Sequence, residues 1–125
     1  MSGADAHYPH AAPVTAYGNG GFRFADMSHR GSILCLPSGV YGWSVARIED
    51  LTIDDLVRPL AELRPPAVLL IGTGLSQAWP QESVLKALIE AKIGFEFMST
   101  GAAARTYNVL LAEGRGVGTA LIAVD

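Results

Sequence analysis

The sequence predicts a single α/β domain, and three observations support that fold class. The chain has 125 residues and 13.2 kDa, the size of one ordinary domain. Hydrophobic residues make up 50% of it and charged residues 17%, so it can bury a core and is not disordered as a whole. The N-terminal half is rich in strand and turn signals, whereas strand and helix patterns alternate in the C-terminal half. We expect a disordered tail over residues 1–15 and one domain over residues 16–125.

The first part of the domain predicts two or three antiparallel strands. A glycine-rich stretch precedes residues 22–24, and residues 31–36 lead into a turn-forming cluster before residues 41–45. Thr52 followed by Asp55 is typical of a capping box and predicts a short helix. Pro59 has no amide hydrogen, so we expect it to break or kink that helix.

The second part predicts a βαβαβ unit. Its elements are an apolar strand over residues 68–71, an amphipathic helix after Pro80 that Gly94 closes, a strand over 95–98, a helix over 101–113 and a strand over 117–124. Crossovers between parallel strands are almost always right-handed. The three strands should therefore lie parallel in one sheet, with the helix of each crossover packed on it.

Two loops should meet where these strands end. In open α/β sheets, ligands bind at the carboxyl ends of the strands, which places Gly72, Thr73 and Gly74 beside Ser99, Thr100 and Gly101. Ser99 or Thr100 can cap the second helix, whose first amides would accept a carboxylate or a phosphate. Glycine in a strand-to-helix loop also has a purely steric explanation, which we rank ahead of a bound anion. We call this predicted edge the rim.

Three further polar residues extend the candidate site. Arg105 and Asn108 fall on the helix face opposite Tyr107, where they would bind a partner's carboxylate or be solvated. Glu96 interrupts a strand that the crossovers should bury, and a buried carboxylate needs a partner. It would be a general base with a raised pKa, a structural ion pair, or a group at a sheet edge; we rank the structural explanations first.

Composition excludes several classes of function. The net charge of −3 and only nine basic residues argue against a nucleic-acid partner. Cys35 is the only cysteine, so it forms no intramolecular disulfide, and we expect no metal and no cofactor. No catalytic triad can be assembled, which favours a non-catalytic role. The apolar run 67–71 is too short to cross a membrane, and no signal peptide is recognisable, so we expect a cytoplasmic protein.

The segment 96–108, followed by residues 113–115, resembles a family signature, together with Gly31-Ser32, Trp43 and residues 70–74. The family it resembles is a set of small, mostly uncharacterised bacterial and archaeal proteins. They are related to the mitochondrial assembly factor 3 of NADH:ubiquinone oxidoreductase, respiratory complex I. The resemblance implies a three-layer domain with a mixed sheet and no established catalytic residue.

This chain also departs from the family pattern, and the departure bears on function. Relatives often carry Asp and Cys where this chain has Ser99 and Ala104, which weakens an enzyme hypothesis based on a thiol. Our first hypothesis is a non-catalytic module that binds a protein partner near the rim and the Arg105 face, by analogy in assembly of a respiratory complex. The alternative is a small enzyme or sensor that binds an anionic metabolite at the rim. A homodimer through the β-rich half is left open.

Overall fold

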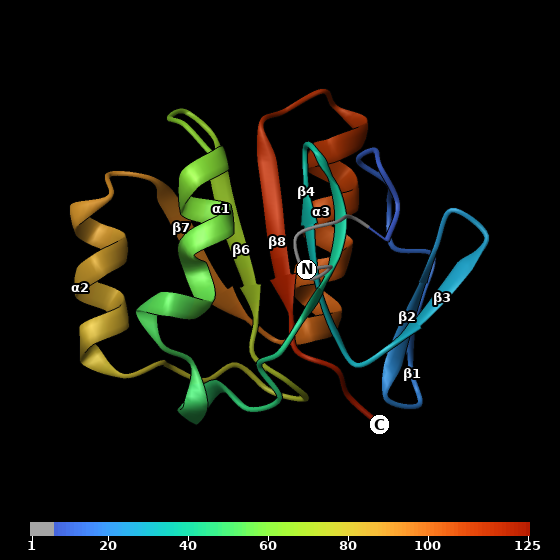
Figure 1. Ribbon diagram of the computed structural model, residues 1–125, viewed down its shortest axis with the longest axis horizontal. Coiled ribbons are helices and arrows are strands. Elements are labelled where there is room, and N and C mark those ends of the chain that lie inside the picture. The colour runs from blue at the N-terminus through green and yellow to red at the C-terminus, as the bar shows by residue number, and fades with distance from the viewer. Residues whose placement is uncertain (1–6) are drawn as a thin grey trace.

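The computed structural model describes residues 7–125, which form two sheets and three α-helices (Figure 1). The larger sheet has five strands in the order β5-β4-β8-β6-β7. Strands β6, β7 and β8 are parallel, whereas β4 is antiparallel to both of its neighbours, so the sheet is mixed. The bounds of these strands are β4 Ser32–Leu36, β5 Gly39–Trp43, β6 Val68–Gly72, β7 Gly94–Met98 and β8 Val117–Leu121.

The predicted βαβαβ unit is confirmed. The chain runs through β6, helix α2 (Glu82–Glu90), β7, helix α3 (Thr100–Ala112) and β8. Strand β6 lies between its two parallel partners, with Leu70 opposite both Glu96 and Thr119. The prediction that Gly94 closes the first helix is wrong. Helix α2 ends at Glu90, the left-handed turn falls on Lys92 with φ of 59°, and Gly94 opens β7.

The N-terminal part is antiparallel as predicted, but it holds more strands than expected. Strands β1 (Ala16–Gly18), β2 (Gly21–Phe24) and β3 (Met27–Arg30) form a separate three-stranded sheet, and β4 pairs with β5. The β2–β3 hairpin turns through Ala25 and Asp26, both with positive φ. Glycine or asparagine is the usual signal for such a turn, and neither is present. The hairpin was therefore missing from the sequence prediction.

The predicted capping box between Thr52 and Asp55 is present. The Thr52 amide donates to the Asp55 carboxylate at 2.9 Å, at the start of the 3-10 turn η3 (Ile53–Leu56), which follows η2 (Ile48–Asp50). Helix α1 (Val57–Glu62) begins directly after η3, so Pro59 lies in a first helical turn. Amide groups in a first helical turn have no hydrogen-bond acceptor within the helix, so the missing amide hydrogen of Pro59 removes no helical hydrogen bond. The chain therefore changes helix type before Pro59, at Leu56.

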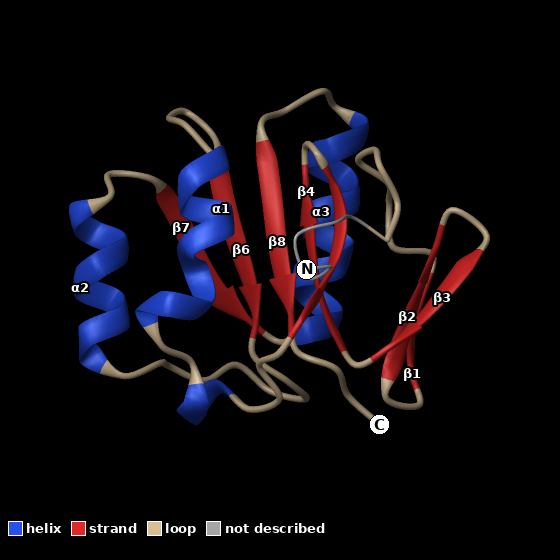
Figure 2. Ribbon diagram, in the orientation of Figure 1, coloured by secondary structure: helices blue, strands red, loops and turns tan. Residues whose placement is uncertain are grey.

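The large sheet separates two apolar cores, which gives the three layers that the family resemblance implied. Helices α1 and α2 cover one face and α3 covers the other (Figure 1). Core residues on the first face include Leu69, Ile71, Val84 and Leu88. On the second face, α3 and the three-stranded sheet share the core, which includes Phe22, Leu70, Ala103, Tyr107 and Leu121. The small sheet stands at the end of the molecule away from α2 (Figure 2).

Part of the segment expected to be a disordered tail is packed against the domain. The His7 amide donates to the Val40 carbonyl at 2.8 Å, and Ala12 and Val14 are buried. The Tyr107 hydroxyl donates to the Ala12 carbonyl at 3.2 Å. Residues 7–15 thus complete the second core, while residues 1–6 of the expected tail lie outside the described residues. Within residues 7–125, no helix combines the length and apolar character needed to cross a membrane.

Candidate functional site

The structure brings the two predicted rim loops together at one edge of the large sheet. The Thr73 amide donates to the Met98 carbonyl at 2.8 Å, and the Thr100 amide donates to the Gly74 carbonyl at the same distance. These bonds continue the β6–β7 ladder past the end of the strands. The loops 72–74 and 99–101 therefore form one hydrogen-bonded junction.

Both threonine side chains are used inside this junction. The Thr100 hydroxyl is fully buried; it donates to the Ile122 carbonyl at 2.7 Å and accepts the Gly74 amide at 3.0 Å. The Thr73 hydroxyl lies 2.8 Å from the Ser76 carbonyl and accepts the Ala78 amide at 3.0 Å. Because buried polar groups need partners, these hydroxyls stabilise the loop backbone. They are not available to a ligand in this arrangement.

The rim glycines are explained by close approach of neighbouring groups. A β-carbon on Gly72 would lie 2.8 Å from the Thr100 α-carbon, and Gly74 has a φ of 119° that favours glycine. At the start of α3, Gly101 lies against the side chains of Tyr17 and Arg105. The Ser99 hydroxyl caps the helix by accepting the Ala102 amide at 3.3 Å. These contacts support the steric explanation of the glycines.

The other three predicted site residues lie in different surroundings. Glu96 is exposed on β7, an edge strand, so the expectation that the crossovers bury it is wrong. Arg105 is exposed on α3, as predicted for the face away from the core. Asn108 binds residue 14 with both ends of its amide: it donates to the Val14 carbonyl at 2.8 Å and accepts the Val14 amide at 2.9 Å. It therefore fixes the N-terminal segment instead of facing solvent.

Two large apolar side chains stand exposed next to the junction. Leu75 is 82% exposed and Trp79 is 65% exposed, both in the loop that Thr73 holds. The Trp79 ring contacts the Phe97 ring of β7, with 5.8 Å between the ring centroids. Large exposed apolar groups that lie close together are typical of binding surfaces. Neither residue is among the site residues predicted from the sequence, and the only sequence signal of Leu75 is an apolar residue in a Gly-Leu-Ser loop.

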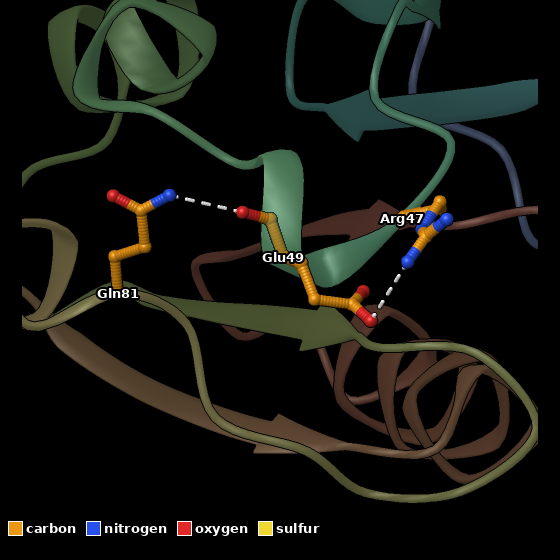
Figure 3. Close-up of polar contacts among 3 residues, drawn as sticks. All are labelled: Arg47, Glu49 and Gln81. Carbon is orange, nitrogen blue, oxygen red and sulfur yellow. Dashed lines mark hydrogen bonds and ion pairs between the residues drawn. The ribbon is translucent and has the colours of Figure 1, made fainter.

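A cavity of about 370 Å³ adjoins the same loop. Thr73, Gly74 and Leu75 line one side, and Arg47 and Glu49 line another. Arg47 and Glu49 form an exposed ion pair at 3.3 Å, and the side-chain amide of Gln81 donates to the Glu49 carbonyl at 3.0 Å (Figure 3). The pKa of Glu49 is lowered, first by the hydrogen bond from its own backbone amide and then by Arg47. We call Leu75, Trp79 and Arg47 the rim surface.

Buried titratable groups elsewhere have structural surroundings. Burial raises the pKa of the Cys35 thiol to about 12, so at neutral pH this residue is an unreactive thiol within the core. Burial also raises the pKa of Tyr107, whose hydroxyl donates to a backbone carbonyl. Within residues 7–125, no three histidine, cysteine, aspartate or glutamate residues are grouped so that they could hold a metal ion.

Comparison with known proteins gives a family match over most of the chain. The model of the family described as "Protein of unknown function (DUF498/DUF598)" matches residues 14–122. A solved structure described as an outer membrane protein from Bartonella henselae is 52% identical, with a TM-score of 0.87, and covers 95% of this chain and 100% of that one. An uncharacterised protein from Rhodobacter capsulatus is 35% identical, covering 98% of this chain and 93% of that protein.

One relative, from Homo sapiens, has a name that describes a role in assembly. It is NADH dehydrogenase [ubiquinone] 1 alpha subcomplex assembly factor 3, which is 32% identical over 114 residues. The match covers 87% of this chain but 59% of the human protein, so the chain spans less than two thirds of that relative's length. These comparisons confirm the family resemblance of the segment 96–108 and the three-layer fold.

Proposed function

Because the chain belongs to the family described as "Protein of unknown function (DUF498/DUF598)", we propose that it is a protein-interaction module that acts as an assembly factor, without catalysing a reaction itself. Its relatives include proteins named as assembly factors of an NADH dehydrogenase subcomplex. By analogy, its partner would be a protein subunit of a membrane-bound respiratory complex, met during assembly in the cytoplasm.

The observation that carries this proposal is the exposed pair Leu75 and Trp79 on a rigid loop. The two side chains are 82% and 65% exposed, and the loop beneath them is held by hydrogen bonds of Thr73 and Thr100. A preorganised loop loses little conformational entropy on binding. Tryptophan and arginine are enriched among the residues that contribute most to protein interfaces, and Arg47 lies across the adjoining cavity.

Affinity capture from native extract tests the proposal. The unmodified protein should recover a partner in stoichiometric amount, and the double variant Leu75→Ser, Trp79→Ser should recover at least tenfold less. Ile89→Ser is the matched control, because Ile89 is 65% exposed near the C-terminal end of α2, away from the rim, and should not affect recovery. Arg105→Glu tests whether the partner also contacts the exposed face of α3. Recovery of the protein alone from repeated captures would refute the proposal.

A second candidate function is supported by the cavity of about 370 Å³ beside Gly74. Its volume is within the range of small-molecule sites, and Arg47 would supply a positive charge for an anionic metabolite. Thermal shift against a panel of metabolite anions would reveal such a ligand. At 100 times its Kd, a ligand adds about 2.7 kcal/mol to stability. A shift that Arg47→Gln abolishes would support a sensor or a small enzyme over the assembly role.

Cell fractionation tests the proposed location. We expect the protein in the cytoplasmic fraction with a minor membrane-associated share that depends on the rim surface. If all of the protein were found in the membrane fraction, and Leu75→Ser and Trp79→Ser did not change this, the cytoplasmic proposal would be contradicted.

A further inference from the structure

The three-stranded sheet has one face that looks away from the core. Side chains alternate between the two faces of a strand, and residues paired across antiparallel strands share a face. Tyr17, Phe22 and His29 form one cross-strand row, and Phe22 is 2% exposed, so that row faces the body of the protein. The opposite face carries two rows, which are Ala16 with Arg23 and Ser28, and Gly18 with Gly21 and Arg30.

This outward face combines a floor of small residues with two arginines. A cavity of about 440 Å³ adjoins it. All six residues of the two rows line this cavity, and so do Asn19 and the row that faces the body of the protein, Tyr17, Phe22 and His29. Four of the six residues are glycine, alanine or serine, so Arg23 and Arg30 are the only long side chains in the two rows. Both arginines are exposed. We call these six residues the cationic face.

In the described part of the chain, neither guanidinium on the cationic face has an acidic partner. Among residues 7–125, the ion pairs are Arg47 with Glu49 and Arg115 with Glu113, both elsewhere. The segment 16–30 contains a single acidic residue, Asp26, at the β2–β3 turn, and within the described chain it pairs with neither arginine. Although the net charge of the protein is −3, two neighbouring arginines thus form no ion pair within residues 7–125.

The spacing of the two arginines suits a particular ligand. Arg23 lies opposite Ser28, two residues before Arg30, so the two arginines are diagonal neighbours on β2 and β3. Such neighbours have α-carbons about 7–8 Å apart. In an extended peptide, residues i and i+2 point to the same side about 6.6–6.8 Å apart. Two carboxylates separated by one residue can therefore reach one guanidinium each.

We propose that the cationic face binds an extended acidic segment of a protein partner, with carboxylates at positions i and i+2. The inference rests on the proposed function, and it names the chemistry of the partner. Guanidinium groups bind carboxylates with two parallel hydrogen bonds, which gives geometric selectivity. The small-residue floor lets the backbone of the segment approach the sheet. Two cations are too few for the salt-displacing contacts that nucleic acid requires, so a peptide fits better.

Peptide titration followed by amide NMR tests the inference. The probe is the seven-residue peptide Gly-Gly-Glu-Gly-Glu-Gly-Gly, compared with its Gln-Gly-Gln analogue and with Gly-Gly-Glu-Glu-Gly-Gly-Gly. The first peptide should shift amides within residues 16–30 saturably and bind at least fivefold more tightly than the other two. Its affinity should fall with added salt. The double variant Arg23→Gln, Arg30→Gln should lower that affinity at least tenfold.

The control is a variant with the same change in charge at other exposed arginines. Arg64→Gln, Arg115→Gln alters arginines that bind the Ala61 carbonyl and Glu113, away from the three-stranded sheet, and should leave peptide affinity within twofold. Equal binding of the Gln-Gly-Gln peptide, no saturable shift, or tighter binding of inorganic phosphate, single-stranded DNA or anionic vesicles than of the acidic peptide would each overturn the inference.

The outcome is separable from that of the proposed function. If partner capture succeeds and depends on Leu75 and Trp79, but the acidic peptide does not bind, only the inference about the cationic face fails. If the peptide binds through both arginines while capture returns no partner, the cationic face stands and the proposed assembly role fails.

Discussion

The rim and the cationic face both carry polar residues among glycines, yet they use them differently. At the rim, the hydroxyls of Thr73 and Thr100 bind backbone groups of the protein itself. On the cationic face, Arg23 and Arg30 make no ion pair with any described residue. Burial explains the contrast, because a buried hydroxyl needs a hydrogen-bond partner within the protein, whereas an exposed guanidinium can form hydrogen bonds with water. Polar groups without an internal partner are therefore the better indicators of a binding surface.

The largest expected effect tests the internal role of the rim. Thr100→Val removes a fully buried hydroxyl with two backbone partners, the Gly74 amide and the Ile122 carbonyl. Leaving such groups unpaired costs about 1–3 kcal/mol each, so we expect a loss of about 3 kcal/mol in urea unfolding. Thr119→Val is the control: its buried hydroxyl has one partner, the Leu70 carbonyl, and should cost about 1 kcal/mol. Equal losses would show that the junction does not depend on Thr100.

A smaller effect is expected where α3 holds the N-terminal segment. Asn108→Ala removes both hydrogen bonds to the Val14 backbone, and we expect a loss of about 1–2 kcal/mol. Hydrogen exchange should accelerate in residues 7–15 before it does in β6 or β8. Partly buried Thr106 of the same helix makes no hydrogen bond to the described part of this segment, so Thr106→Ala serves as a comparison. Unchanged exchange in residues 7–15 would contradict the role assigned to Asn108.

A pH effect should distinguish the cationic face of the small sheet from its opposite face, where Tyr17, Phe22 and His29 face the body of the protein. The pKa of His29 lies below its ordinary value of 6.5, mainly because of burial and then because of His7, although a hydrogen bond with the Ser32 backbone opposes the shift. The unfolded chain therefore takes up a proton more readily than the folded chain. Stability should be full above about pH 6.5 and should fall as the pH drops through the lowered pKa of His29.

Urea unfolding at a series of pH values measures this dependence. His29→Gln should flatten the curve between pH 6.5 and 5, and the exposed His10→Gln should leave it unchanged. We expect a smaller loss than that of Asn108→Ala, because His29 is only partly buried. A curve that keeps its slope in His29→Gln would assign the dependence to another group.

The smallest expected effect completes the comparison. The double variant Arg23→Gln, Arg30→Gln should change the free energy of unfolding by no more than about 0.5 kcal/mol, since exposed side chains without partners contribute little to stability. Chemical denaturation measures this value. A loss above about 1 kcal/mol would mean that the arginines support the fold, and the contrast with the rim would no longer hold.

The C-terminal half was largely predictable from the sequence because its signals are local. An apolar run such as residues 68–71 indicates a buried parallel strand, and the right-handed crossover rule then places the three strands parallel in one sheet. The meeting of the loops at Thr73 and Thr100 followed from that topology. Element ends were less certain, since Lys92 takes the left-handed turn that the sequence assigned to Gly94.

The N-terminal half was less predictable because its order depends on distant partners. Residues 7–15 carry no strong pattern, and they are held by Val40, Tyr107 and Asn108, the last two more than 90 positions along the chain. The edge position of Glu96 depended on the strand order, which periodicity does not reveal. The cationic face depended on a register that only the paired strands define.

Gly31 is the single residue between β3 and β4, and its φ of 99° turns the chain from one sheet into the other. Because the three-stranded sheet also shares a buried core with α3 and the large sheet, the cationic face and the rim surface are held at a fixed separation. A partner that contacts both would meet the second contact at a high effective concentration, and two individually weak affinities would combine into a much stronger one.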